Sequence, residues 1–400
     1  MWLRINQNCL FFVLGLAVAS TFFLILFSNN IGFHGSEILK ADTLPKQPVL
    51  LKQDPEVFDE TDDKITELLT DPPEDDNDED EYAGEDGIDY VDEEAHAMFK
   101  HTHENPVASA LKDTVRVFCW IMTSPKNIKS RAIHVNATWA PRCNKYVFVV
   151  SNSTNSTDYD LPIVELEIPD GRNSLWGKTK AAHQYIYDNE LDNYDWFLKA
   201  DDDTYVIMEN LRFMLLAHEP SNPIYFGCKF KPFTKQGYMS GGSGYVLSRE
   251  AVKLFVEDGL TNPKYCTKQN GGNEDVEIGK CLEKVNVTAG DSRDAKGRHR
   301  MLPFRPELHI SGGNGTMPKW FYQYIYYPYH DGTECCSDYA ISWHYVNREW
   351  MHTLDNMFYH IKPVGTIDDG FWTQKAFTDN TREDLIDKLK VFSKNMSPAN

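Results

Sequence analysis

Residues 195–203 read Asp-Trp-Phe-Leu-Lys-Ala-Asp-Asp-Asp, a short apolar run that ends in three consecutive carboxylates. The run 196–200 has the composition of a buried strand, whereas the three carboxylates behind it repel one another unless a positive group binds them. A hard divalent cation that also contacts phosphate oxygens is a usual partner for such a cluster. Aspartates are common in turns, so a solvated acidic turn or a loose calcium loop stays open at this point.

The sequence around this run alternates strands with helices. We predict strands at 115–122, 145–150, 163–168, 195–200 and 224–227, and helices at 129–139, 176–190, 208–218 and 249–257. This alternation over residues 112–230 predicts an α/β domain with a mainly parallel central sheet. Ligands of such sheets bind beyond the carboxyl ends of the strands, which is where the three aspartates fall.

The N-terminal region contains an uncharged run at 10–27. A helix of this length is about 27 Å long, just enough to cross the bilayer core. We predict an uncleaved signal anchor, with residues 1–9 as a cytosolic tail and the rest of the chain in the lumen. A cleaved signal peptide is the main alternative, but the run is longer than usual for one and no small-x-small cleavage site follows it.

The formal net charge of −20 belongs to one segment. Residues 54–94 contain twenty-one acidic side chains and one lysine, so the remainder is close to neutral. Such a segment is predicted to be disordered and extended, and we interpret residues 28–111 as a stem. An acidic interaction tail is the competing interpretation. Nucleic-acid binding is disfavoured because the chain has no basic stripe.

Two further patterns agree with a lumenal body. Seven of the eight cysteines lie after residue 110, and in an oxidising compartment six of them could form three disulfides and leave one over. Their spacing fits no zinc motif. Six Asn-x-Ser/Thr sequons are candidate glycosylation sites: Asn136, Asn152, Asn155, Asn286, Asn314 and Asn395.

Four other segments carry residues suited to chemistry. The loop 169–178 brings Arg172 and Lys178 to a helix N-terminus, where a diphosphate could bind, although an ordinary basic turn is equally plausible from this segment alone. The segment 240–248 has three glycines, which allow a ligand to approach the backbone closely.

The third and fourth segments are 273–277 and 342–346. In the third, Asp275 lies at the start of a predicted helix, 274–285, where acidic residues often act only as caps but an ionised carboxylate could also be a general base. In the fourth, His344 lies in a short apolar strand; it could be a core residue or, with a distant aspartate, a ligand suited to manganese.

Taken together, WFLKADDDTYV, GGSGYVLS, NEDVEIGKCL and CCSDYAISWHYV resemble the β1,3-glycosyltransferases of glycosyltransferase family 31, and most closely their core 1 group. The resemblance covers about residues 112–365, which we predict to be a catalytic domain with a GT-A-like fold, followed by a C-terminal tail, 366–400. It implies a Golgi type II membrane enzyme. It also implies inverting transfer of galactose from UDP-galactose to O3 of GalNAc on glycoproteins, with Mn²⁺ as cofactor.

The resemblance also implies a role for each matching residue. It assigns Asp203 and His344 to the metal and Asp275 to the general base. The donor-binding set would be Asp170, Gly171, Arg172, Lys178, Asp201 and Asp202, and the acceptor-binding set Trp320, Gly242 and Glu274. A homodimer is a further possibility that the family raises. The alternatives are a fringe-like transferase that uses UDP-GlcNAc and a non-catalytic transferase chaperone.

Overall fold

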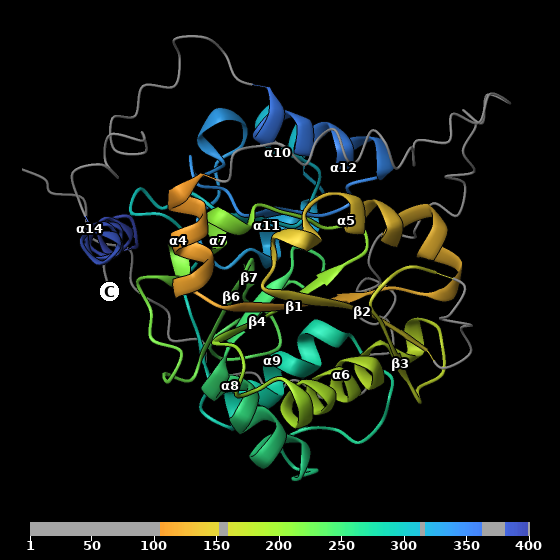
Figure 1. Ribbon diagram of the computed structural model, residues 1–400. Coiled ribbons are helices and arrows are strands. Elements are labelled where there is room, and N and C mark those ends of the chain that lie inside the picture. Colours follow the sequence, from red (N-terminus) through yellow and green to blue (C-terminus); the bar gives the residue numbers. More distant parts are fainter. Residues whose placement is uncertain (1–104, 152–158, 313–316, 362–380, 399–400) are drawn as a thin grey trace, which may run out of the picture. The chain divides into compact units, whose positions relative to one another are not determined.

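The computed structural model describes residues 105–151, 159–312, 317–361 and 381–398 (Figure 1). All of them fall in one compact unit, Ile88–Asn400. The predicted anchor at 10–27 and nearly all of the predicted stem lie outside the described residues. Within the described ranges, no helix combines the length and the apolar character that a bilayer crossing requires.

A seven-stranded mixed sheet forms the centre of the unit, in the order β10-β6-β9-β4-β1-β2-β3. Its strands are β1 (Val117–Met122), β2 (Lys145–Ser151), β3 (Ile163–Leu166), β4 (Trp196–Asp201), β6 (Ile224–Gly227), β9 (Tyr245–Ser248) and β10 (Thr288–Ala289). Strands β4, β1, β2 and β3 are mutually parallel, whereas β9 runs antiparallel between β4 and β6. The predicted mainly parallel sheet is therefore confirmed, and β9 and β10 are the two of its strands that the sequence analysis did not predict.

Helices cover both faces of this sheet, as Figure 1 shows. One face packs against α6 (Leu175–Asn189), α8 (Arg249–Leu254) and α9 (Glu274–Lys284), and the other lies toward α4 (Pro106–Thr114), α5 (Ile133–Ala137) and α7 (Met208–Leu215). Strand β1 is buried along its whole length and alternates between the two cores: Val117, Cys119 and Ile121 face one, and Phe118, Trp120 and Met122 the other. Burial on both faces explains why its sequence is continuously apolar.

A second, three-stranded sheet, β11-β12-β5, lies beyond the three aspartates Asp201–Asp203, which we call the triplet. It consists of β11 (Met301–Leu302), β12 (Ser342–Trp343) and β5 (Tyr205–Val206), the last of which follows the triplet directly. A two-stranded ribbon joins β7 (Lys229–Phe230) to β8 (Tyr238–Met239). The remaining α-helices are α10 (Pro306–Ile310), α11 (Lys319–Tyr324), α12 (Arg348–Asp355) and α14 (Arg382–Asn395).

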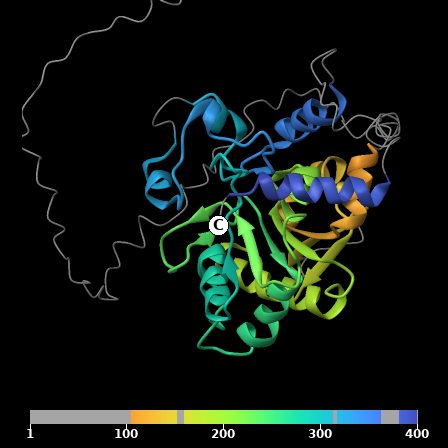
Figure 2. The same cartoon turned by 90° about the vertical axis from the view of Figure 1, so that its left-hand side faces the viewer.

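The helix predicted at 129–139 forms differently: a π-helical turn, Ile128–Ala132, leads into α5, which ends at Ala137. The C-terminal helix α14 lies beside α4 and α7 (Figure 2). Its Leu385 and Leu389 are buried, and the Ser393 hydroxyl donates to the Phe213 carbonyl at 2.5 Å. The predicted domain bounds remain a prediction.

The cysteines form three disulfides, as their number predicted. Cys119 pairs with Cys143, Cys266 with Cys281, and Cys335 with its neighbour Cys336. Among the described residues Cys228 is the remaining thiol, and it is buried. The first bridge ties β1 to the segment before β2, and the second ties α9 to the loop that precedes it.

Candidate active site

Two carboxylates and one imidazole meet at the carboxyl end of β4. One ligand atom from each of Asp201, Asp203 and His344 lies within 4.8 Å of the others. The approach follows from the topology, because the chain turns after Asp203 into β5, and β5 pairs antiparallel with β12, which ends one residue before His344. A backbone hydrogen bond of 2.8 Å from the Val346 N–H to the Asp203 carbonyl fixes the two segments together.

This cluster is surrounded by cations. Lys199, buried in the middle of β4, places its Nζ 2.7 Å from Asp201 Oδ1. Arg131 places a guanidinium nitrogen 3.2 Å from Asp203 Oδ2, and His344 Nε2 lies 3.2 Å from Asp203 Oδ1. Burial opposes ionisation of Asp203, but the charge and hydrogen bond of His344, aided by Arg131 and Lys199, lower its pKa to about 2. Asp203 is therefore an ionised carboxylate at neutral pH.

The middle aspartate of the triplet faces a different partner. Asp202 is 5% exposed, and its Oδ2 accepts a 2.6 Å hydrogen bond from the Thr123 hydroxyl just beyond β1. Burial, together with the nearby Asp203 charge, raises the pKa of Asp202 to about 7. The triplet therefore divides: Asp201 and Asp203 join the cluster with His344, and Asp202 is directed toward the end of β1. The predicted donor role of Asp202 remains a prediction.

His344 is held in a close-fitting position by backbone. A Cβ built on Gly242 would lie 2.2 Å from both Cε1 and Nδ1 of the imidazole, so only glycine leaves room for the ring there. The Tyr345 ring is a second close neighbour, with its centroid 3.9 Å from that of His344. Tyr345 itself has a φ of 55°, which is uncommon for a bulky residue. Residues with such backbone conformations are found more often at functional sites than elsewhere.

The glycine segment also links the cluster to the predicted base. The Gly241 carbonyl accepts from Lys199 Nζ at 3.1 Å, and the Gly241 N–H donates to Asp275 Oδ2 at 3.2 Å. Asp275 is partly exposed in the first turn of α9, and its other oxygen accepts from the Val276 N–H at 2.7 Å. Two backbone donors and a helix N-terminus stabilise the ionised form of a carboxylate.

Glu274, one residue earlier, is buried instead. Its Oε1 accepts from the Thr179 hydroxyl at 2.9 Å and from the Tyr245 hydroxyl at 2.5 Å. Burial raises its pKa, against the opposing effect of the nearby Lys199. These contacts make Glu274 a brace between α6, β9 and α9, and its predicted contact with an acceptor remains a prediction.

The other four residues predicted to bind the donor lie close together in the loop and helix after β3: Asp170, Gly171, Arg172 and Lys178. The ammonium of Lys178, which is 2% exposed, lies 2.6 Å from Asp170 Oδ1 and 3.4 Å from the Thr123 carbonyl. Burial opposes ionisation of Asp170, but the Lys178 hydrogen bond and charge lower its pKa overall. Gly171 adopts a φ of 111°, which L side chains rarely tolerate, and Arg172 beside it is exposed. Thr123 therefore links the two groups of residues: its carbonyl contacts Lys178, and its hydroxyl contacts Asp202.

Trp320 is half-buried on α11. Its ring makes edge-on and tilted contacts with Phe230 and Phe304, and Phe304 in turn stacks on Tyr345 at 6.2 Å between centroids. An aromatic series thus leads from Trp320 to the residue that follows His344. A sugar-binding role for Trp320 remains a prediction, supported by this continuity.

Three of the sequons lie within the described residues. Asn286 and Asn395 are exposed, whereas the Asn136 side chain is partly buried and its Oδ1 accepts from the Tyr146 hydroxyl at 2.7 Å. Asn152, Asn155 and Asn314 lie outside the described residues.

Three residues of the site were missing from the sequence predictions: Thr123, Arg131 and Lys199. A signal for Lys199 existed, because a lysine inside an otherwise apolar buried strand requires an acidic partner. Thr123 and Arg131 lie more than seventy residues before the triplet and carry no comparable local signal.

Comparison with known proteins agrees with this geometry. Residues 112–295 match a family model described as Fringe-like. The chain is 44% identical over 298 residues to glycoprotein-N-acetylgalactosamine 3-beta-galactosyltransferase 1 of Xenopus laevis, covering 74% of this chain and 79% of that protein.

More distant relatives match a shorter stretch. Human chondroitin sulfate synthase 3 is 28% identical over 188 residues, which cover 43% of this chain and 21% of that protein. Mouse beta-1,3-glucosyltransferase is 26% identical over 174 residues, covering 43% and 34%. A solved galactosyltransferase, LgtC with donor and acceptor sugar analogs, aligns at 10% identity with a TM-score of 0.33, over 62% of this chain and 98% of that chain, a score from which we draw no argument.

The family model and the extensive match to the Xenopus protein, taken with the mixed α/β sheet and its acidic carboxyl edge, settle the family. The chain belongs to the Fringe-like β1,3-glycosyltransferases of glycosyltransferase family 31, in the branch of the glycoprotein-N-acetylgalactosamine 3-beta-galactosyltransferases.

Proposed function

We propose that this protein transfers galactose from UDP-galactose to O3 of GalNAc-α-Ser/Thr on glycoproteins, with inversion at the anomeric carbon. The observation that carries the proposal is that Asp275 accepts from the Gly241 N–H, next to Gly242 and the His344 of the Asp201–Asp203–His344 cluster, so that the proposed base and the proposed cation site share one glycine segment. The 44% identity to the Xenopus galactosyltransferase supports the choice of donor and acceptor.

The residues of the cluster fit a divalent cation. Two carboxylates and one imidazole form the O/N donor set that suits manganese and related ions, and their ligand atoms already lie within 4.8 Å of one another. Asp203 and His344 would hold the ion, and Asp201 is placed to join them. When bound, Mn²⁺ supplies positive charge that stabilises the diphosphate as it leaves.

The remaining chemistry belongs to the side chains of the protein. Lys178 and Arg172 would bind and orient the anionic part of a nucleotide, and their position on the loop and helix that follow β3 supports this role. Asp275 takes the proton from the acceptor hydroxyl while the oxygen of that hydroxyl forms a bond to the anomeric carbon of galactose. The bond from the anomeric carbon to the diphosphate of UDP breaks in the same step. A single displacement of this kind needs one base and inverts the α-linked donor to a β-linked product. A double displacement would require a second carboxylate as nucleophile.

A second candidate function is fringe-like transfer from UDP-GlcNAc, because the family model that matches residues 112–295 is described as Fringe-like. The deciding experiment incubates the full-length protein and Mn²⁺ with UDP-galactose or UDP-GlcNAc and a GalNAc-bearing peptide, and identifies the product linkage by mass spectrometry and NMR. Galactose transfer to O3 is expected. Transfer from UDP-GlcNAc alone would refute the proposed donor, and no transfer from either would favour the non-catalytic chaperone.

We further propose a single-pass type II protein of the Golgi membrane, with the catalytic part in the lumen. The uncharged run at 10–27, the six sequons and the three disulfides support this location. Alkali extraction of membranes and protease protection of the C-terminal part test it. Release by alkali or digestion in intact vesicles would contradict it.

A further inference from the structure

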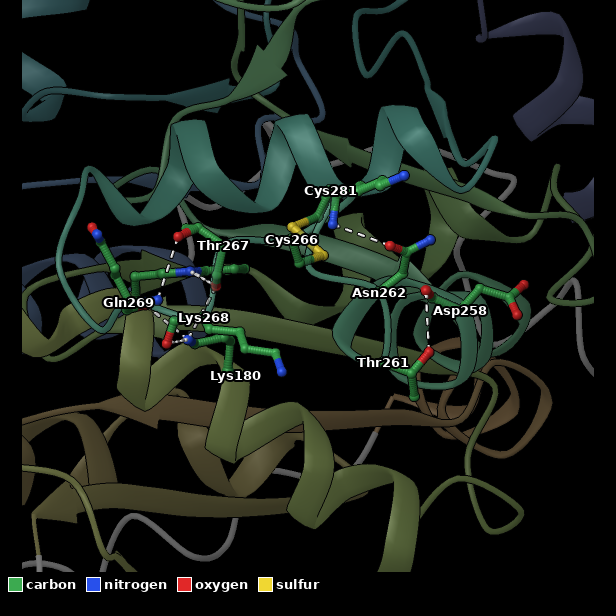
Figure 3. The surroundings of a disulfide bond; sticks show 11 residues. Lys180, Asp258, Thr261, Asn262, Cys266, Thr267, Lys268, Gln269 and Cys281 are labelled. Atoms are coloured by element: carbon green, nitrogen blue, oxygen red, sulfur yellow. Dashed lines mark hydrogen bonds between the residues drawn. A yellow bond between two sulfur atoms is a disulfide. The ribbon is translucent and has the colours of Figure 1, made fainter.

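A loop that the proposed mechanism does not use joins the donor side of the site to the helix that carries the base. We call residues 266–273 the strap. It begins at Cys266, which is bridged to Cys281 of α9, and it ends at Asn273, the N-cap of α9. Figure 3 shows this loop lying against α6, whose N-terminal end comes shortly after residues 170–172, which are predicted to bind the donor.

Polar contacts fasten the strap to α6. Lys180 donates from one ammonium group to three consecutive carbonyls, those of Thr267 at 3.3 Å, Lys268 at 3.0 Å and Gln269 at 2.8 Å (Figure 3). The Trp176 indole N–H also donates to the Thr267 carbonyl, at 3.2 Å. Since a lysine ammonium has three donors, all of its hydrogen-bonding capacity is used on the strap.

Farther along, the strap contacts the loop 169–178, which carries Arg172 and Lys178 and which we call the donor loop. The Gly177 N–H, next to Lys178, donates to the Asn270 carbonyl at 3.1 Å, and a Cβ on Gly271 would lie 3.4 Å from the Asn173 carbonyl. The contact at Gly177 is tight, because a Cβ there would lie 2.8 Å from Asn270 Cγ. The strap therefore contacts Asn173, which follows Arg172, and Gly177, which precedes Lys178.

The strap begins in a hydrophobic core, since Cys266 is 2% exposed. Beyond it, a pocket of about 410 Å³ is lined by both the strap and α6, with Lys180, Thr267 and Asn270 among its lining residues. Hydrogen bonds from Lys180 and Trp176 hold residues 267–269 against the helix. Removal of three charge-assisted bonds should therefore loosen the strap locally and leave the two cores intact.

We propose that Lys180 is a positioning residue for nucleotide binding, which acts by fastening the strap against the donor loop. This inference rests on the proposed function for the identity of the nucleotide. The two glycines Gly271 and Gly272 separate the fastened part of the strap from Asp275, so the effect falls on donor binding more than on proton transfer. Lys180 touches neither the cluster nor the base.

The test uses the full-length protein as Lys180→Met, Lys180→Arg and, as a matched control, Lys253→Met on the exposed side of α8. Calorimetry measures the Kd of UDP in the presence of Mn²⁺, steady-state assays measure KM for UDP-galactose and kcat, and hydrogen exchange follows residues 266–273. For Lys180→Met we expect the UDP Kd and the donor KM to rise about tenfold, with kcat changed less than threefold and faster exchange confined to the strap. Arginine should restore most of the affinity, and Lys253→Met should resemble wild type.

An unchanged UDP Kd in a folded Lys180→Met protein overturns the inference, as does a fall in kcat without a change in donor KM. If Lys180→Met does not fold, Gly177→Ala provides the second route: it should weaken UDP binding by pushing Asn270 outward, and Gly177→Ala with Asn270→Ala should recover it. If the double variant does not recover UDP binding, the proposed role of the strap in donor binding is wrong. Wild-type protein that binds UDP but transfers no galactose refutes the proposed function alone, since the UDP measurements still decide the role of Lys180.

Discussion

Substitution of Gly242 by alanine tests how closely the backbone fits the imidazole of His344. The added Cβ would lie 2.2 Å from two ring atoms and 2.6 Å from Nε2. Carbon atoms in contact normally lie about 3.5–4.0 Å apart, so the ring must move by about 1 Å or more. The movement is constrained because the backbone N–H of His344 donates to the Leu302 carbonyl at 3.2 Å and the Tyr345 ring centroid lies only 3.9 Å from that of the imidazole.

A displacement of this size exceeds what metal coordination tolerates, since ligand distances vary by only about 0.2 Å. We expect Gly242→Ala to raise the Kd of Mn²⁺ by about 10–100-fold, as seen when the support of a metal ligand is lost. Overpacking should also cost about 1–3 kcal/mol of unfolding free energy. Titration calorimetry with Mn²⁺ in the presence of UDP gives the affinity, and urea unfolding without metal gives the stability.

For the unfolding measurement, Gly271→Ala is the matched control, because its Cβ would make only an ordinary 3.4 Å contact with the Asn173 carbonyl. The double variant Gly242→Ala with His344→Ala provides an internal check. Removing the ring should relieve the clash, so the double variant should be more stable than the sum of the two single effects predicts. If Gly242→Ala binds Mn²⁺ as tightly as wild type and unfolds at the same urea concentration, the steric argument is wrong.

Three further predictions follow from individual residues. Asp275→Asn should lower kcat by about 10²–10⁴-fold, because the base is lost, and leave the Kd of UDP within twofold; retained turnover would remove Asp275 from the base role. Thr123→Val deletes the 2.6 Å hydrogen bond to the buried Asp202 carboxyl and should cost about 1–3 kcal/mol in urea unfolding, whereas no loss would contradict that contact. His183 is buried with no partner for its Nε2, and burial lowers its pKa to about 4, below the ordinary value of about 6.5. The unfolded chain therefore binds more protons between these pH values, and stability falls as the pH drops from about 6.5 toward 4, by up to about 1.4 kcal/mol per pH unit from this group. His183→Leu should flatten that slope in urea unfolding at pH 7, 6 and 5, and an unchanged slope would argue against a neutral buried imidazole.

Much of the fold was predictable because strand and helix patterns along this chain are strong and local. The strand before the triplet, predicted at 195–200, is β4 at Trp196–Asp201, and the helix predicted at 176–190 is α6 at Leu175–Asn189. The segment 240–248 was interpreted through its glycines alone, and so the strand Tyr245–Ser248 was missed. Its antiparallel insertion between β4 and β6, both of which precede it in the sequence, is a tertiary choice that a four-residue pattern does not specify.

The candidate site was predictable in outline and less so in its internal arrangement. The sequence analysis grouped Asp201 with Asp202 as donor ligands, whereas the structure groups the carboxylates of Asp201 and Asp203 and sets Asp202 apart. Strand β4 ends at Asp201 and the chain turns at Asp202 and Asp203, where the Thr204 N–H donates to the Asp201 carbonyl at 3.1 Å, so the side-chain directions follow from this turn and not from strand alternation. The partners of the triplet were beyond prediction because Thr123 and Arg131 reach it through the parallel pairing of β1 with β4 and the adjacent helical turn.

The cations around the triplet explain how its carboxylates remain together in the folded chain. Two like charges about 4 Å apart repel by about 4 kcal/mol at an effective dielectric constant of 20, so each needs a compensating charge. Lys199 is 2% exposed and bonded to both Asp201 and the Gly241 carbonyl. The Asp201 side chain is 27% exposed, and removing Lys199 would take away the ammonium that offsets its charge beside Asp203. Arg131 has a side chain that is 43% exposed, and its contacts of 3.2 Å and 3.5 Å with Asp203 and Asp202 are longer and screened by water. The two cations therefore differ in function. Lys199 is part of the structure that fixes β4 to the glycine segment, and Arg131 offers a weaker contact at the same carboxylate that the proposed metal ion would occupy.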